Sequence, residues 1–158
     1  MRDGVTYSFD ANGWMKTGWQ VEDGAWRYYA PSGAMATGWT AVGGTWYYLD
    51  PDTGVMATGW LKDGDTWYYL HGSGAMATGW VNLGGAWFYL NGNGSMATGW
   101  VNLGGTWYYL TESGQMAIGW VKDGGSWYFC HPWGAMATGR VVYGGTAYTF
   151  DGSGRWVA

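Results

Sequence analysis

Tryptophan is the residue type in this chain that could most clearly do chemistry, and its spacing is regular. The chain has 158 residues, of which 15 are Trp, 13 are Tyr and 4 are Phe. A Gly-Trp pair recurs at steps of 20 or 21 residues, and a second Trp follows seven residues after the first. The pairs are Trp19 and Trp26, Trp39 and Trp46, Trp60 and Trp67, Trp80 and Trp87, Trp100 and Trp107, and Trp120 and Trp127. Aromatic rings have a negative face, so rings around a small void would attract a cation, above all a quaternary ammonium, which cannot donate strong hydrogen bonds.

Other groups that could do chemistry are few. His71 and His131 are the two histidines, and both fall in predicted loops where other repeats carry Asp, Asn or Thr. Cys130 occupies the Leu position of its repeat, so we expect a buried structural thiol. The sequence has no Ser/His/Asp set, metal-ligand spacing or phosphate-binding Gly loop. We therefore expect no catalysis, no cofactor and no metal site within these residues.

The charge pattern limits the class of partner. Charged residues make up 11% of the chain, the formal net charge is −4, and Lys and Arg do not cluster. This argues against a nucleic-acid surface. No apolar run approaches the roughly 20 residues that a membrane span needs, so we expect no membrane insertion, and no secretory signal is visible. A mildly acidic, aromatic surface suits a cationic or neutral ligand.

Turn residues between the two Trp of each unit predict the elements that position them. The turn pairs are Asp23-Gly24, Gly43-Gly44, Gly64-Asp65, Gly84-Gly85, Gly104-Gly105 and Gly124-Gly125. Such pairs between short β-prone runs are a strong signal for a hairpin, because primed turns need positive φ. A single hairpin is marginal in water, so stacked hairpins must share a core. The expected fold is an all-β repeat solenoid of stacked β-hairpins with about 20 residues per repeat.

The repeat predicts a single module over residues 1–158, because no linker interrupts it. We expect a partial N-terminal capping repeat over residues 1–17, six full hairpin repeats over residues 18–138, and a C-terminal capping repeat over residues 139–158.

Strand alternation separates two faces of each hairpin. In the second repeat, Trp46 and Tyr48 share one face and Tyr47 and Leu49 share the other. A two-residue turn at Gly43-Gly44 would add Trp39 to the face of Trp46 and Tyr48. The Asp63-Gly64-Asp65 run is a point where the third hairpin could shift its register.

The two chain ends favour binding over packing as the role of the Trp face. Both terminal repeats keep the Tyr47 and Leu49 positions, as Tyr7 with Phe9 and Tyr148 with Phe150. Both lose the Trp46 and Tyr48 positions, and Arg140 replaces the last Gly-Trp tryptophan. An aromatic stripe is more often core than site, but capping repeats must pack and need no ligand. Loss of one stripe at both ends therefore indicates a functional Trp face.

At these residues the chain resembles the choline-binding repeat family of bacterial autolysins, phage endolysins and surface proteins. The runs Thr78-Gly79-Trp80, Gly84-Gly85-Ala86-Trp87-Phe88-Tyr89-Leu90 and Met96-Ala97-Thr98-Gly99-Trp100 match its motif almost throughout. The resemblance implies a secreted, extracellular module of the bacterial cell wall that binds choline or phosphocholine on teichoic acid. It also implies a catalytic or adhesive domain elsewhere in a larger protein, and it is compatible with a homodimer.

The resemblance further implies aromatic cages between successive hairpins, each with two Trp of one hairpin, a ring of the next hairpin and a Met. Carried over by position, the predicted cages are Trp19, Trp26, Tyr48 and Met35; Trp39, Trp46, Tyr69 and Met56; Trp60, Trp67, Tyr89 and Met76; Trp80, Trp87, Tyr109 and Met96; and Trp100, Trp107, Phe129 and Met116. Trp120 and Trp127 are expected to form a poor site, because Thr149 offers no third ring. Two alternatives stay open: a glucan-binding repeat module that stacks sugars on Trp and Tyr, and a structural or self-association spacer.

Overall fold

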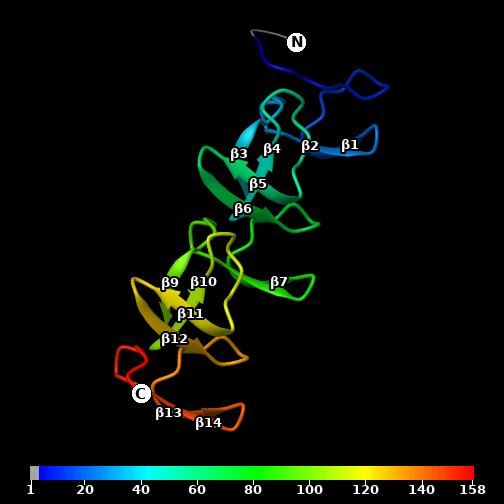
Figure 1. Cartoon of the computed structure of the whole chain (residues 1–158). Coiled ribbons are helices and arrows are strands. Elements are labelled where there is room, and N and C mark those ends of the chain that lie inside the picture. The colour runs from blue at the N-terminus through cyan, green and yellow to red at the C-terminus, as the bar shows by residue number, and fades with distance from the viewer. Residues whose placement is uncertain (1–3) are drawn as a thin grey trace. The chain divides into compact units, whose positions relative to one another are not determined.

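The computed structural model describes residues 4–158, which form seven two-stranded antiparallel hairpins (Figure 1). The described residues contain no helix. The strands are β1 Gly18–Glu22, β2 Ala25–Tyr29, β3 Gly38–Val42, β4 Thr45–Leu49, β5 Gly59–Asp63, β6 Thr66–Leu70, β7 Gly79–Leu83, β8 Ala86–Leu90, β9 Gly99–Leu103, β10 Thr106–Leu110, β11 Gly119–Asp123, β12 Ser126–Cys130, β13 Gly139–Tyr143 and β14 Thr146–Phe150. The predicted fold class, an all-β array of repeated hairpins, is confirmed.

The hairpin register follows from two-residue turns. In β3 and β4, Trp39 lies opposite Tyr48, as the turn at Gly43 (φ 59°) and Gly44 (φ 84°) requires. In the third hairpin Trp60 lies opposite Tyr69, so the register is the same and the shift that the Asp63-Gly64-Asp65 run allowed does not occur. There Gly64 takes φ 63°. A turn with one positive-φ residue in its first position joins the strands as well as one with two.

The last side chain of each second strand is buried, and together these side chains form the core. Leu49, Leu70, Leu90, Leu110 and Cys130 are fully buried, with 0% of their surface exposed. Burial raises the pKa of the Cys130 thiol to about 11. Cys130 is therefore a neutral, unreactive core residue, as its place in the repeat predicts.

The connectors fold back onto the hairpins through a Met in each repeat. Backbone bridges join Leu49 to Met56 and Leu110 to Met116. Gly54 has φ +74°, and a Cβ there would lie 2.6 Å from Sδ of Met35. The connector Gly is thus needed both for its backbone conformation and for space beside a Met of the preceding repeat.

The chain divides into two compact units, Met1–Ala77 and Thr78–Ala158. The first holds β1 to β6 and the second β7 to β14. Among residues 4–158, no helix is long and apolar enough to span a membrane.

The N-terminal end of the first unit is stabilised by polar contacts around Glu22. Its carboxylate accepts hydrogen bonds from Tyr29 Oη and Ser8 Oγ, both at 2.7 Å, and lies 3.6 Å from Lys16 Nζ. The bond from Tyr29, together with those from Ser8 and Lys16, holds the pKa of Glu22 below its usual range. The contacts join residues of the predicted capping repeat to the first hairpin.

Candidate ligand-binding site

In four of the hairpins the two Trp meet edge to face: Trp19 with Trp26, Trp60 with Trp67, Trp80 with Trp87, and Trp120 with Trp127. Trp80 and Trp87 have ring centroids 6.4 Å apart and planes at 88°. Trp19 and Trp26 do the same at 6.4 Å and 83°. The second Trp of each hairpin stays open to solvent, with Trp87 42% exposed. Each of these four hairpins therefore presents two nearly perpendicular indole walls.

The third wall comes from the next hairpin, but from a different Tyr than expected. Trp19 contacts Tyr47 at 4.8 Å, with the planes at 69°. The same contact recurs between Trp39 and Tyr68, Trp80 and Tyr108, Trp100 and Tyr128, and Trp120 and Tyr148. The sequence-based set took the ring on the Trp-bearing face of the next hairpin. The face that turns back to the preceding hairpin is the opposite one, which carries Tyr47 and Leu49.

The expected rings lie instead beside the first Trp of their own hairpin. Tyr48 is 5.1 Å from Trp39, and Phe129 is 5.3 Å from Trp120. The same pairing holds for Trp60 with Tyr69, Trp80 with Tyr89, and Trp100 with Tyr109. Phe129 is only 3% exposed. These rings therefore pack against the first Trp of their own hairpin and line none of the three cavities described below. Tyr48, Tyr109 and Phe129 are thus not brought into the cages to which position alone assigned them.

The methionines are also displaced by one repeat from the expected sets. The backbone N–H of Met56 donates to the carbonyl of Trp26 at 2.8 Å, which places Met56 beside the first Trp pair. Met35 donates to Thr6 instead, at 2.8 Å. The same bond joins Met76 to Trp46, Met116 to Trp87 and Met136 to Trp107. The Met of a cage thus comes from the connector that follows the second hairpin, one repeat later than expected.

Three cages enclose measurable cavities. The Trp19 cage is lined by Trp19, Trp26, Tyr47 and Met56, with Gly72 and Ser73 at its edge, and has a volume of about 310 Å³. The Trp80 cage is lined by Trp80, Trp87, Tyr108, Met116, Pro132 and Trp133, with about 330 Å³. The Trp100 cage is lined by Trp100, Trp107, Tyr128, Met136 and Ser153, with about 200 Å³. The indoles are therefore not packed against one another, and each cage draws on three successive repeats.

The Trp39 cage has the same walls: Trp39, Trp46, Tyr68 and Met76. In the third hairpin, Trp60 and Trp67 are 6.4 Å apart at 88°. These two Trp belong to the first unit and the predicted partner Tyr89 to the second, so the third ring of this cage stays a prediction. Its predicted Met76 lies beside Trp46 instead.

Two site residues were missed in the sequence, Trp133 and Trp156. Trp133 lines the Trp80 cage from a connector and stacks on His131, with centroids 4.5 Å apart and planes 6° apart. Trp156 takes the place of the cage Met beside the sixth pair. Its backbone N–H donates to the backbone carbonyl of Trp127 at 2.7 Å, and its ring centroid is 5.9 Å from that of Trp120. The sequence did hold a signal for them: twelve of the 15 Trp form the six pairs, and three Trp remain outside the pairs.

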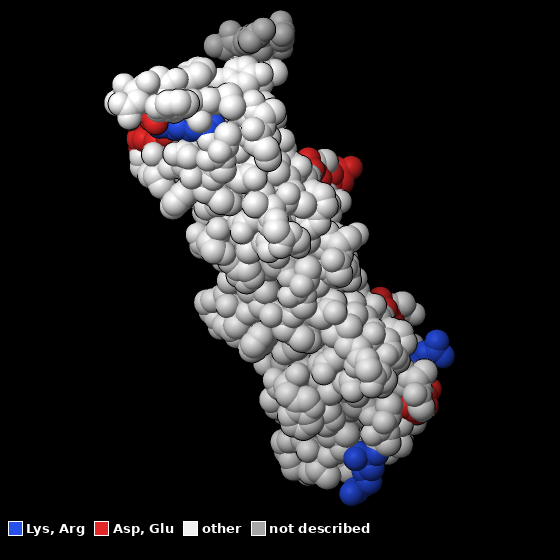
Figure 2. Space-filling model, turned by 180° about the vertical axis from the view of Figure 1, so that it is seen from behind, with Lys and Arg blue, Asp and Glu red and all other residues white. Residues whose placement is uncertain are grey.

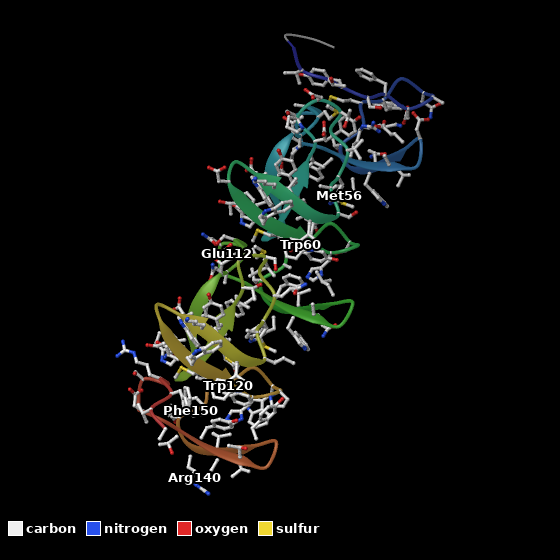
Figure 3. All side chains as sticks on the ribbon, viewed as in Figure 1. Met56, Trp60, Glu112, Trp120, Arg140 and Phe150 are labelled. Carbon is white, nitrogen blue, oxygen red and sulfur yellow. The ribbon has the colours of Figure 1, made fainter. Side chains whose placement is uncertain are left out.

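The sixth pair therefore has more aromatic walls than expected. Trp120 contacts Tyr148 at 4.9 Å and Phe150 at 5.6 Å, and Trp120 and Phe150 lie close together in Figure 3. Arg140, on β13, lies below Trp120 and Phe150 in Figure 3. We define the Trp120 cage as Trp120, Trp127, Tyr148 and Trp156. Tyr148 and Phe150 carry out the packing expected of the terminal repeat.

Few charges lie near the cages. The face drawn in Figure 2 is mostly uncharged, with Lys, Arg, Asp and Glu at separate points. Two carboxylates do reach cage walls: Asp63 accepts from Trp39 Nε1 at 3.0 Å, and Asp123 accepts from Trp100 Nε1 at 2.9 Å. Burial and the nearby Asp63 raise the pKa of Tyr48. No group of three His, Cys, Asp or Glu that could hold a metal occurs within residues 4–158.

Open three-ring cages repeated along a stack of hairpins define a class of modules that bind small cationic groups through aromatic faces. A family model described as choline-binding repeat matches residues 2–37, 36–78 and 77–118, and a cell wall binding repeat model matches residues 118–136. The chain belongs to the choline-binding repeat family.

Solved structures agree with this assignment. The chain is similar to CbpJ from Streptococcus pneumoniae, with 45% identity, a TM-score of 0.93, and coverage of 96% of this chain and 56% of that one. Choline binding protein F of the same organism is 43% identical, with a TM-score of 0.88 and coverage of 96% of this chain and 55% of that one. The modular autolysin LytC of Streptococcus pneumoniae is 32% identical, with a TM-score of 0.75 and coverage of 96% of this chain and 36% of that one. The chain thus spans about half the length of the first two relatives. No curated protein sequence matches the chain.

Proposed function

We propose that this chain is a non-catalytic, cell-wall-anchoring module that binds choline residues of teichoic acids in its aromatic cages. The observation that supports this most is the open cavity between two Trp of one hairpin and a Tyr of the next, about 200 to 330 Å³ in the Trp19, Trp80 and Trp100 cages. A trimethylammonium group fits within such a cavity, where its methyl groups contact the rings and its charge lies against their faces.

Each cage is a weak site and the module is a strong one. Three rings that the ligand desolvates contribute about 2 kcal/mol each, and immobilising the ligand offsets roughly a third of this sum, which leaves about 4 kcal/mol. That free energy corresponds to a dissociation constant near one millimolar. Several cages on one polymer that carries many choline groups raise the overall affinity by effective concentration, without any new contact.

The proposal includes a place for the module in a larger protein. CbpJ, CbpF and LytC are all longer than this chain. We infer an extracellular protein of the bacterial cell wall in which this module tethers a catalytic or adhesive domain. Self-association into a homodimer is compatible with the exposed Trp face.

Titration of the whole chain with choline should change its intrinsic fluorescence with a midpoint near one millimolar per cage, because ligand would contact at least two Trp in each. Glucose oligomers serve as the competing ligand class, since sugars also stack on Trp. A fluorescence change with the oligomers and none with choline would replace this proposal with the glucan-binding one.

The third wall can be tested with two neighbouring tyrosines. Tyr108→Leu should weaken choline binding at the Trp80 cage about tenfold, because it removes one desolvated ring face. Tyr109→Leu is the matched variant: Tyr109 lies 4.9 Å from Trp100 and lines no part of the Trp80 cavity. The measurement is a choline titration followed by the Trp80 indole N–H signal in two-dimensional NMR. Equal losses at the Trp80 cage in both variants would contradict the assignment of Tyr108.

A further inference from the structure

The cages differ in charge although their rings repeat. The last residue of each first strand is Glu22, Val42, Asp63, Leu83, Leu103, Asp123 or Tyr143. This position of a hairpin faces the first Trp of the preceding hairpin, as the bonds from Trp39 to Asp63 and from Trp100 to Asp123 demonstrate. The equivalent residue for the Trp19 cage is Val42, and for the Trp80 cage it is Leu103. Two cages therefore have a carboxylate on an indole and two have an aliphatic side chain.

The two carboxylates are not neutralised by cations. Within residues 4–158, both ion pairs involve Glu22, and neither Asp63 nor Asp123 has a cationic group within 4.0 Å. Asp123 is not among the residues that line the Trp100 cavity. It thus holds the indole N–H from outside, where its charge adds to the negative potential of the ring without occupying the space of a ligand.

A Lys precedes each of these Asp residues and acts on a different cage. Lys122 lies opposite Trp127 in the hairpin register, and its Nζ is 5.8 Å from the centre of that ring. Lys62 holds the same position over Trp67 at 6.0 Å. Alternate residues of a strand point to opposite faces, so the Asp reaches the preceding cage and the Lys covers a Trp of its own hairpin.

We propose that the Lys62-Asp63 and Lys122-Asp123 pairs give the cages different affinities for a quaternary ammonium. Asp63 and Asp123 make the Trp39 and Trp100 cages the preferred sites for a quaternary ammonium, and Lys122 makes the Trp120 cage a weaker one. The inference rests on the proposed function, because it concerns which of the choline cages fill first. The Trp19 cage, with Val42, is the uncharged reference.

The size of the effect follows from the charge and its exposure. A unit charge several ångströms from a bound cation, partly screened by water, changes affinity roughly three- to tenfold. Salt reduces it, since the Debye length is about 8 Å at physiological ionic strength. A hydrogen bond from an indole to a carboxylate also fixes the ring, and a test must separate this positioning from the charge.

The test uses the full chain and two isosteric probes, choline and its uncharged analogue 3,3-dimethylbutan-1-ol. Indole N–H signals in two-dimensional NMR report each cage separately. We expect Asp63→Asn and Asp123→Asn to weaken choline binding roughly three- to tenfold at the Trp39 and Trp100 cages, respectively, with the Trp19 cage unchanged. Binding of the uncharged analogue should not change, because Asn keeps an acceptor for the indole. Asp65→Asn, in a turn, is the matched control for net charge.

Two further measurements avoid reliance on those variants. Lys122→Gln should strengthen choline binding at the Trp120 cage by a similar factor. In the unsubstituted chain, added NaCl should weaken choline binding at the Trp39 and Trp100 cages more than at the Trp19 cage. The inference is overturned if choline affinity at the two Asp cages is unchanged, or if the analogue loses as much as choline. Absence of choline binding at every cage would refute the proposed function itself, which is a different result.

Discussion

Trp107→Ala should lower choline affinity at the Trp100 cage about 30-fold and leave the fold intact. Trp107 is a wall of that cavity and is 41% exposed. Its removal takes away one ring face worth about 2 kcal/mol when a ligand desolvates it, and opens the cage to water. Because the side chain is already half in solvent, the cost to unfolding should stay below about 1 kcal/mol.

The measurement is a choline titration read at the Trp100 indole N–H, with circular dichroism to check the fold. Trp14→Ala is the matched control, because Trp14 is 72% exposed and belongs to no cage. It should leave choline binding unchanged. If Trp107→Ala unfolds the chain, the Trp face is core, and the assignment of the two faces is reversed.

Leu110→Ala should destabilise the second unit by about 2–5 kcal/mol. Leu110 has no exposed surface and forms a backbone bridge to Met116, so its truncation leaves a cavity at the junction of a hairpin and its connector. In a repeat array each hairpin depends on its neighbours, and the loss should therefore be felt by the adjoining hairpins as well.

Urea unfolding followed by far-ultraviolet circular dichroism measures this loss. Leu103→Ala removes the same atoms from a partly exposed strand end and should cost less than about 1 kcal/mol. Similar midpoints for the two variants would mean that the row of buried aliphatic side chains is not the core of the unit.

Local sequence rules determined the hairpins of this protein. Gly43-Gly44 tolerates the positive φ of a two-residue primed turn, and that turn places Trp39 opposite Tyr48. Successive side chains of a strand point to opposite faces, so the sequence alone places Tyr47 on one face of the hairpin and Tyr48 on the other. The family followed from the resemblance of the repeat motif and is confirmed, whereas the role of the Trp pairs in ligand binding stays a prediction.

Tertiary structure decided which face of one hairpin meets its neighbour. Strand alternation separates Tyr47 from Tyr48 but does not say which of them turns back toward Trp19, because that depends on the path of the connector. The bond from Met56 to Trp26 fixes this path, and it brings Tyr47 and Met56 into the cage instead of Tyr48 and Met35. Contacts within one hairpin are set by short-range geometry. Contacts between hairpins depend on how one whole hairpin is rotated relative to the preceding one, and no short stretch of sequence encodes that rotation.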